Sequence, residues 1–315
     1  MDVTSYMLGK KAGGGSQINN QDKSISITSN GTTTANADSG YTGLGTVSIT
    51  TNVPTAADDY FTTTVTKQNK NNFSSVFIKQ MPALTINNNV EDCINLFYNW
   101  PFTSINLSNF DTSNIISMYG MFGSSKLTSA DFSSFNTEKV TNMSNMFSSS
   151  SFTSVDLSSF NTPALTTVIA MFSYAMSLVT VNLGNNFDTS QVTAGSNMFN
   201  YCMSLKTITG HLDFSSADNF YNLFGGCSAL QDLPTFANIG KGFRTTSEAH
   251  NSGYTLNLSS SPNLTHTSLM NVINGLYDIA TAGCETQDLV LGATNLAKLS
   301  SAEIAIATDK GWTVS

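Results

Sequence analysis

The stretch LTSADFSSFNTEKVTNMSNMF, residues 127–147, decides the fold because its large apolar residues recur elsewhere in the chain at a fixed spacing. Leu-Phe and Met-Phe dipeptides mark this spacing, and their phenylalanines are Phe97, Phe122, Phe147, Phe172, Phe199 and Phe224. The steps between them are 25, 25, 25, 27 and 25 residues. The same spacing appears in three further columns: Leu107, Phe132, Leu157 and Leu183; Phe110, Phe135, Phe160 and Phe187; Ile115, Val140, Leu165 and Val192. A period of this length indicates stacked repeats.

Each repeat has two halves with different apolar periods. Residues 153–159, TSVDLSS, alternate so that Val155 and Leu157 share one face, which predicts a short half-buried strand. In residues 137–147, the apolar residues from Val140 to Phe147 follow the stripe of a short helix. Such a unit cannot bury its own apolar face, but stacked copies can. We therefore predict an α/β fold, a leucine-rich-repeat-like solenoid with a parallel sheet along one side.

The frame (D/N)LSSF(D/N)T…V…NM…MF in these repeats resembles the 25-residue leucine-rich-like repeat of bacterial surface proteins. Both the BspA-like family and the mycoplasma lipoprotein-associated repeats carry it. The resemblance covers roughly residues 84–236. Copies drift toward its end, since GNNFDTSQVTAGSNMF, residues 184–199, has two extra residues and HLDFSSADNFYNLF, residues 211–224, is irregular. We expect that end to be distorted or to carry a loop.

The sequences on both sides of the repeats predict further elements. Beyond them we expect strands at residues 254–261, 288–292 and 311–315, a helix at residues 267–280, and a last helix with a Ser300–Glu303 capping box. Before them, alternating residues predict strands at residues 24–28 and 46–51. The predicted organisation is an N-terminal docking arm (1–23), a small β module with its linker (24–72), the solenoid (73–240), and atypical repeats with a cap (241–315).

The flanks resemble a different group of proteins. YMLGKKAGGG, GYTGLGTVSITTNV and LVLGATNLAKLSSAEIAIATDKGWTVS are similar to segments of structural proteins of tailed phages of gut bacteria, including crAss-like phages. This resemblance implies an arm that docks to other virion proteins, with Tyr6, Leu8, Lys10 and Lys11 as candidate contacts. It also implies assembly in the host cytoplasm and a fibre that could be a homotrimer. The N-terminal residues show no secretion signal, as expected of a virion protein; a bacterial adhesin should carry one.

Composition and motifs argue against several classes of function. The net charge is −8 and no basic cluster is present, which argues against nucleic-acid binding. No run approaches the ~20 apolar residues that span a bilayer, so membrane insertion is not expected. The histidines His211, His250 and His266 occupy no catalytic or metal-binding motif. We therefore predict a non-enzymatic protein without a catalytic residue, cofactor or metal.

Cys202 and Cys227 are 25 residues apart and occupy equivalent positions in adjacent repeats. Neighbouring parallel strands lie about 4.8 Å apart, so a disulfide and a pair of free thiols that fill one core column are both open. A disulfide would persist only in an oxidising compartment.

Polar columns supply the candidate binding surfaces. A row on the exposed strand face comprises Asn106, Asp131, Asp156 and Asn182, flanked by Ser104, Ser129, Ser154 and Thr180. Asp131 and Asp156 could share a cation or bind a glycan, and a merely solvated face is the alternative. A second candidate is a binding loop in residues 206–254, with Tyr221, Phe243, Arg244 and His250. The column Asp111, Asn136, Asn161 and Asp188 is interpreted as turn-forming.

These patterns favour a bacteriophage virion protein, a fibre or appendage component that projects its repeats toward a host-surface glycan or protein. A bacterial cell-surface adhesin of the BspA-like type is the alternative.

Overall fold

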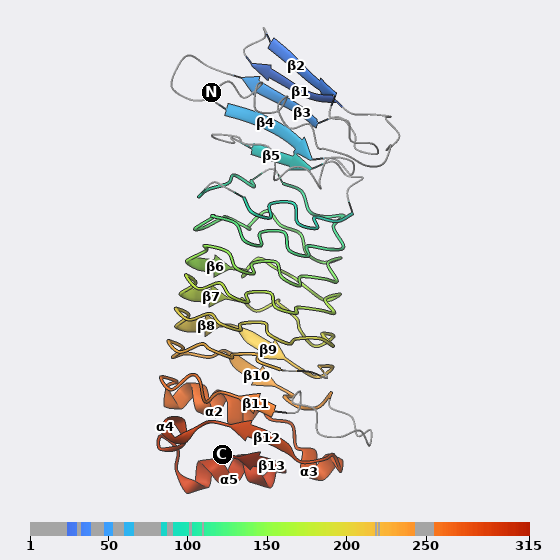
Figure 1. Ribbon diagram of the computed structural model, residues 1–315. Helices are drawn as coiled ribbons and strands as arrows, with labels where there is room; N and C mark the ends of the chain where they lie inside the picture. Colours follow the sequence, from blue (N-terminus) through green and yellow to red (C-terminus); the bar gives the residue numbers. More distant parts are fainter. Residues whose placement is uncertain are drawn as a thin grey trace, which may run out of the picture.

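The computed structural model (Figure 1) describes residues 91–100, 103–108, 110–217, 219, 221–242 and 255–315, together with five N-terminal strands. These strands are β1 (Ser24–Ser29), β2 (Thr33–Asp38), β3 (Val47–Asn52), β4 (Tyr60–Val65) and β5 (Ala83–Ile86). They form one sheet in the order β2-β1-β3-β4-β5. The strands predicted at residues 24–28 and 46–51 are confirmed as β1 and β3. The predicted docking arm lies outside the described residues.

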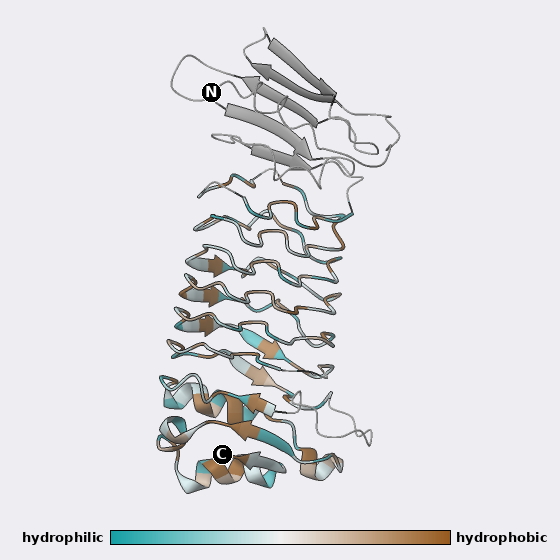
Figure 2. Ribbon diagram, viewed as in Figure 1, coloured by the Kyte–Doolittle hydropathy of each residue, from teal (hydrophilic) through white to brown (hydrophobic). Residues whose placement is uncertain are grey.

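The repeats are joined by short parallel pairings. Strands β6 (Ser154–Asp156), β7 (Thr180–Asn182) and β8 (Thr207–Thr209) form one parallel sheet, and β9 (His211–Asp213) pairs in parallel with β10 (Thr235–Ala237). Val155 is buried between exposed neighbours in β6, as the alternation predicted. Figure 2 shows the hydrophobic centres of β6, β7 and β8 one above another. The predicted α/β character is therefore present, with small parallel sheets.

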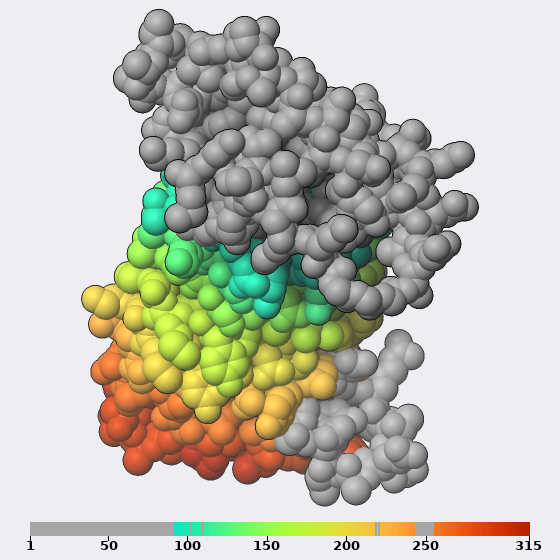
Figure 3. All heavy atoms as spheres, turned by 45° about the horizontal axis from the view of Figure 1, so that its top comes forward, coloured from blue at the N-terminus to red at the C-terminus, as the bar shows by residue number. Residues whose placement is uncertain are grey.

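The short helix predicted within each repeat is wrong. The stretch around residues 143–150 is a run of turns that follows an isolated parallel bridge. These bridges connect one repeat to the next in an unbroken series: Asp92↔Ser117↔Asn142↔Thr167↔Ala194↔Asn219. In Figure 3 the colour bands of successive repeats adjoin one another, which agrees with close packing between them.

Hydrogen bonds explain why this stretch is not helical. The N–H groups of Asn145, Phe147 and Ser149 donate to carbonyls of the following repeat, at 2.9, 2.8 and 2.8 Å. Those of Met146 and Ser148 donate three residues back, to Met143 and Asn145. Asn145 and Ser149 have positive φ angles of 57° and 55°. A left-handed residue at every fourth position interrupts a helix but preserves an apolar spacing of three to four residues, which is the pattern that misled the helix prediction.

Aromatic side chains fill the interior in continuous stacks. The predicted phenylalanine column is fully buried, and each ring stacks on the next at centroid distances of 5.3, 5.7, 5.2, 5.1 and 5.6 Å from Phe97 to Phe224. A second column contains Phe110, Phe135 and Phe160, with neighbouring centroids 5.9 and 6.1 Å apart. The columns predicted from sequence are therefore core ladders, and their register with the backbone pairing places every repeat in the same orientation.

A buried threonine follows each turn-forming Asp or Asn, and sequence reasoning missed its role. The Thr137 hydroxyl donates to the Asn161 carbonyl at 2.9 Å and accepts the Asn161 N–H at 2.9 Å. Thr112 and Thr189 bond in the same way to Asn136 and Asp213. Each hydroxyl pairs with both a backbone N–H and a backbone carbonyl of the next repeat. The recurrent threonine after F-(D/N) was the available signal.

The C-terminal region uses helices instead of turns. Its parallel sheet contains β11 (Thr255–Asn257), β12 (Gln287–Val290) and β13 (Trp312–Val314), at the three predicted positions. The helices are α2 (His266–Gly275), α3 (Ile279–Ala282), α4 (Ala293–Leu296) and α5 (Ser301–Asp309). None of the helices in the described part of the chain is long and apolar enough to cross a bilayer.

The helix predicted at residues 267–280 ends earlier, at Gly275, where α2 meets the last repeat. The Ile239 N–H donates to the Gly275 carbonyl at 3.0 Å, and the Tyr277 N–H donates to the Ile239 carbonyl at 2.9 Å. A Cβ at Gly275 would lie 2.5 Å from that of Phe236. The close approach and the competing backbone bonds end the helix despite the apolar stripe that continues beyond it.

Candidate binding surfaces

The predicted row on the strand face is present, and its side chains have a structural role. Asp131 and Asp156 are exposed, whereas Asn106 and Asn182 are half-buried. Each side-chain oxygen accepts the N–H group two residues later, at 3.0 Å for Asn106, 2.9 Å for Asp131 and Asp156, and 3.1 Å for Asn182. This is the Asx turn, which ends the strand and redirects the chain.

The row is also linked from repeat to repeat. The Asn182 amide donates to Asp156 Oδ1 at 3.0 Å, and the Thr209 hydroxyl donates to Asn182 Oδ1 at 3.0 Å. Hydrogen bonds from the backbone and then the side chain of Ser133 lower the pKa of Asp131, so this carboxyl stays ionised in mildly acidic solution. The described residues contain no group of three or more His, Cys, Asp or Glu side chains that could hold a metal. A binding role for the row stays a prediction.

The turn-forming column behaves as its residue types indicate. The oxygens of Asp111, Asn136 and Asp188 accept the N–H group two residues later, at 2.9, 3.1 and 2.8 Å. Within the predicted binding loop, Tyr221 is exposed. Phe243, Arg244 and His250 lie outside the described residues, so a binding role for this loop stays a prediction.

A third surface was not found by sequence reasoning. Tyr174 and Tyr201 occupy equivalent positions in adjacent repeats, and their rings stack with centroids 4.9 Å apart and an interplanar angle of 15°. Met176 and Met203 follow them two residues later. The exposed fractions of these side chains are 45% and 40% for the tyrosines and 48% and 45% for the methionines. We name these four residues the tyrosine–methionine edge. The repeated Tyr-x-Met was the signal in the sequence.

The two aligned cysteines are free and buried. The Cys202 thiol donates to the Phe172 carbonyl at 3.0 Å, and the Cys227 thiol donates to the Phe199 carbonyl at 2.9 Å. A hydrogen bond with Cys227, and then burial, raise the pKa of Cys202. Both residues fill one core column, and the protonated thiol is the favoured state of Cys202.

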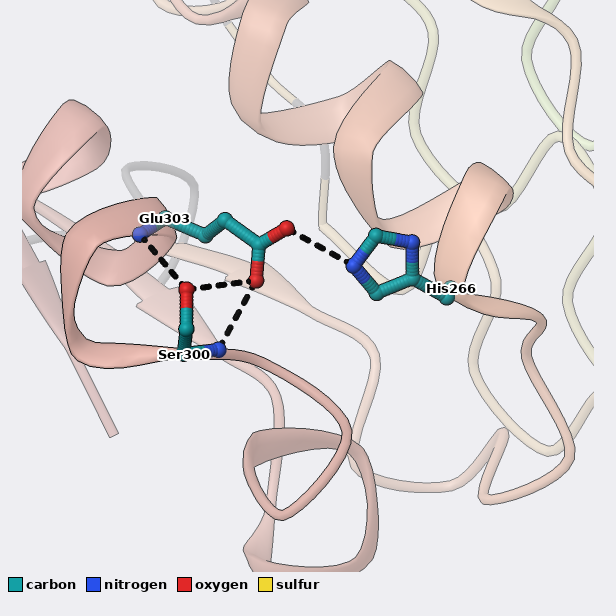
Figure 4. A network of polar contacts seen from close by, with 3 residues as sticks. All are labelled: His266, Ser300 and Glu303. Carbon is teal, nitrogen blue, oxygen red and sulfur yellow. Dashed lines mark hydrogen bonds and ion pairs between the residues drawn. The ribbon is translucent and has the colours of Figure 1, made fainter.

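The described histidines have simple partners. His266 Nε2 lies 2.8 Å from Glu303 Oε1, which connects α2 to α5 (Figure 4). Glu303 also accepts hydrogen bonds from the N–H and hydroxyl of Ser300, so the predicted capping box is confirmed. His211 Nδ1 contacts the Thr235 hydroxyl at 2.9 Å. These contacts connect neighbouring elements of the fold.

The fold and these surfaces define an α/β repeat protein with short parallel sheets. A comparison with protein-family models gives a match over the repeats. Residues 91–207 and 128–238 match the family model described as "Mycoplasma protein of unknown function, DUF285". These overlapping matches cover the stacked repeats and support the mycoplasma and BspA-like side of the resemblance. The phage-like flanks lie outside the matched residues. No curated protein and no solved structure matches the chain.

Proposed function

We propose that the chain is a non-enzymatic attachment protein whose leucine-rich-repeat-like solenoid holds a binding surface away from its anchored end. The observation that carries this proposal is the unbroken series of parallel bridges from Asp92 to Asn219. Such pairing, together with the phenylalanine stack, makes an elongated scaffold whose length grows with repeat number. Most of the recurrent spacing then serves the scaffold, and surface positions are free to vary between repeats.

The first candidate role is a fibre or appendage of a bacteriophage virion. The resemblance of the flanks to phage structural proteins supports it. In this role residues 1–23 dock to other virion proteins, and the repeats meet a glycan or protein on the host surface. A homotrimer is the assembly that this role implies. The second candidate is a bacterial cell-surface adhesin, which the match to a mycoplasma family favours.

Antibodies against the full chain separate the two roles when applied to purified virions and to intact bacteria of the source culture. The virion role predicts labelled particles, and the adhesin role predicts labelled cell surfaces. For the docking arm, particles are assembled with the full chain or with a variant that lacks residues 1–17. Incorporation should fall in the variant. Equal incorporation would exclude docking through the arm.

Attachment itself is tested by the binding of purified full chain to intact bacteria. The double variant Asp131→Asn with Asp156→Asn tests the strand-face row, because asparagine preserves the oxygen that each Asx turn needs and removes the charge. Weaker binding would assign the row a contact with the host. Unchanged binding would direct attention to another surface.

A further inference from the structure

The tyrosine–methionine edge is confined to two repeats. The residues equivalent to Tyr174 and Tyr201 are Ser124 and Ser149 in the preceding repeats and Gly226 in the following one, all with positive φ. The equivalence follows from the backbone, since Ser149, Tyr174 and Tyr201 each donate to the matching carbonyl of the next repeat, at 2.8, 2.8 and 2.6 Å. The two stacked tyrosines are therefore exposed, and the equivalent positions in the repeats on either side hold the small residues Ser149 and Gly226.

The two ends of this stack differ. Tyr201 lies over Gly226, where an added Cβ would come within 2.9 Å of the ring, so that ring face is closed by backbone. The outer face of Tyr174 is directed toward the preceding repeat, where the equivalent residue is the small, exposed Ser149. The repeats space these rings 4.9 Å apart. The space above Ser149 therefore accommodates one further ring that continues the stack.

Two residues beside this space indicate the chemistry of its occupant. Ser149 and Ser151, the residues equivalent to Tyr174 and Met176, are both uncharged and carry hydroxyl groups. The face of an aromatic ring is partly negative and attracts the C–H groups of a second ring. A neutral ring with a C–H face and a hydroxyl rim matches both features. A stable protein partner needs about 800 Å² on each side, more than four half-exposed side chains offer.

We propose that the tyrosine–methionine edge binds a neutral hexopyranose unit of a surface glycan, stacked on the outer face of Tyr174 above Ser149. The sugar's hydroxyl rim lies against Ser149 and Ser151, and Tyr201 supports the Tyr174 ring from behind. This inference rests on the proposed attachment function and names its ligand. A single sugar ring binds with a dissociation constant on the order of 1 mM, so firm attachment uses several copies of the chain.

Saturation-transfer NMR on the full chain tests the proposal, with the methyl glycosides of glucose, galactose and mannose as probes. Methyl glucuronide serves as the anionic comparison. Two variants test the site in opposite ways, one by removing a ring and the other by adding one. Tyr174→Ser removes the stacking ring and reproduces the residue of the preceding repeat. Ser149→Tyr adds a ring that fills the proposed space, at a position whose equivalents already hold tyrosine with a similar φ. Tyr119→Ser is the matched control, because its equivalent one repeat later is Ser144.

We expect at least one neutral glycoside to receive saturation at its ring C–H protons. Both site variants should weaken its binding about 10-fold or more, as the loss of a stacking partner does for nucleic-acid bases. Tyr119→Ser should bind like the original chain. The proposal is overturned if no neutral glycoside binds, if Ser149→Tyr binds equally or more tightly, or if Tyr119→Ser loses as much.

Binding to intact bacteria, measured in parallel, separates this inference from the attachment function. If the chain binds cells and Tyr174→Ser binds them equally, the inference fails and attachment stands. If the chain binds a neutral glycoside in the expected pattern but binds no cells, the stacking site stands and the attachment function fails. If Ser149→Tyr strengthens binding to cells, an apolar protein contact replaces the sugar and overturns the inference.

Discussion

The repeats in residues 91–242 and the C-terminal region in residues 255–315 both use short parallel strands, but they complete each turn of the chain differently. In the turns of the repeats, every second backbone N–H group donates a hydrogen bond to a carbonyl of the next repeat. In the C-terminal region, α2 and α5 are helices with internal backbone hydrogen bonds, and each begins at a side-chain cap, Thr265 and Ser300. A single repeat therefore depends on its neighbours for backbone bonds as well as for its core. A C-terminal helix depends on its neighbours mainly for apolar burial.

The largest effect is expected from the phenylalanine stack, which has no counterpart in the C-terminal region. Phe147 is fully buried, with stacked neighbours at 5.7 and 5.2 Å. Phe147→Ala should lower the free energy of unfolding by about 3–5 kcal/mol, because it leaves a cavity between two rings. Urea unfolding of the full chain measures this loss. Phe147→Leu, which retains more volume, is the control, and a loss below about 1 kcal/mol for alanine would contradict a continuous stack.

The threonine column tests the dependence of repeats on their neighbours' backbone. Thr137→Val keeps the shape of the side chain but leaves the N–H and carbonyl of Asn161 without their partner. Unfolding free energy should fall by about 1–3 kcal/mol, because two partly buried hydrogen bonds are lost and each contributes about 0.5–1.5 kcal/mol. Thr128→Val, at an exposed threonine, should change it by less than about 0.5 kcal/mol. Equal effects at the two sites would show that the buried hydroxyls are dispensable.

One substitution should have opposite signs in the two regions. Ala170 lies in a repeat turn with φ of 53°, where glycine avoids the cost of a Cβ. Ala170→Gly should raise the free energy of unfolding by about 0.5–1 kcal/mol, after the greater entropy of unfolded glycine is subtracted. Ala305→Gly, inside α5, should lower it by about 1 kcal/mol. Thermal unfolding of both variants gives the comparison, and destabilisation by both would place Ala170 in ordinary helical geometry.

An effect of similar size is expected at the cap of α5. Ser300→Ala should cost about 1 kcal/mol, the usual value of an N-cap serine. Hydrogen bonds from Ser300, then from His266, lower the pKa of Glu303. Its contribution is therefore present above the pKa of unfolded glutamate and is lost as pH falls through the folded pKa. In Ser300→Ala the pKa of Glu303 should rise, which NMR titration measures. An unchanged pKa would assign the shift to the Ser300 N–H, which the variant retains, and to His266.

The sequence predicts the repeat and its core well because burial follows spacing. The columns that contain Phe147, Leu157 and Val140 are all buried, as their period requires. It does not distinguish turn from helix in residues 137–147, because both bury a residue every three to four positions. The two conformations differ in the acceptor of the Asn145 N–H. In the turn this acceptor is the carbonyl of a residue 24 positions later, which the local spacing does not reveal.

The candidate surfaces were less predictable. The oxygens of Asp131 and Asp156 are partly used by Asx turns, and spacing alone does not separate such use from ligand binding. Tyr174 and Tyr201 belong to the repeat period, but their exposure depends on the left-handed turn conformation. That conformation turns their side chains outward beside a buried phenylalanine column. Sequence patterns that assume a helix miss this exposure.

Hydrogen-bond scalar couplings measured by NMR on deuterated full chain test the central claim most directly. We predict a coupling between the Phe147 nitrogen and the Met171 carbonyl carbon, which belong to adjacent repeats; the Phe147 N and Met171 O atoms lie 2.8 Å apart. A helix would instead couple the Phe147 nitrogen to the Met143 carbonyl carbon. Detection of the coupling to Met171 would establish that turns join the repeats, and detection of the coupling to Met143 would contradict the account.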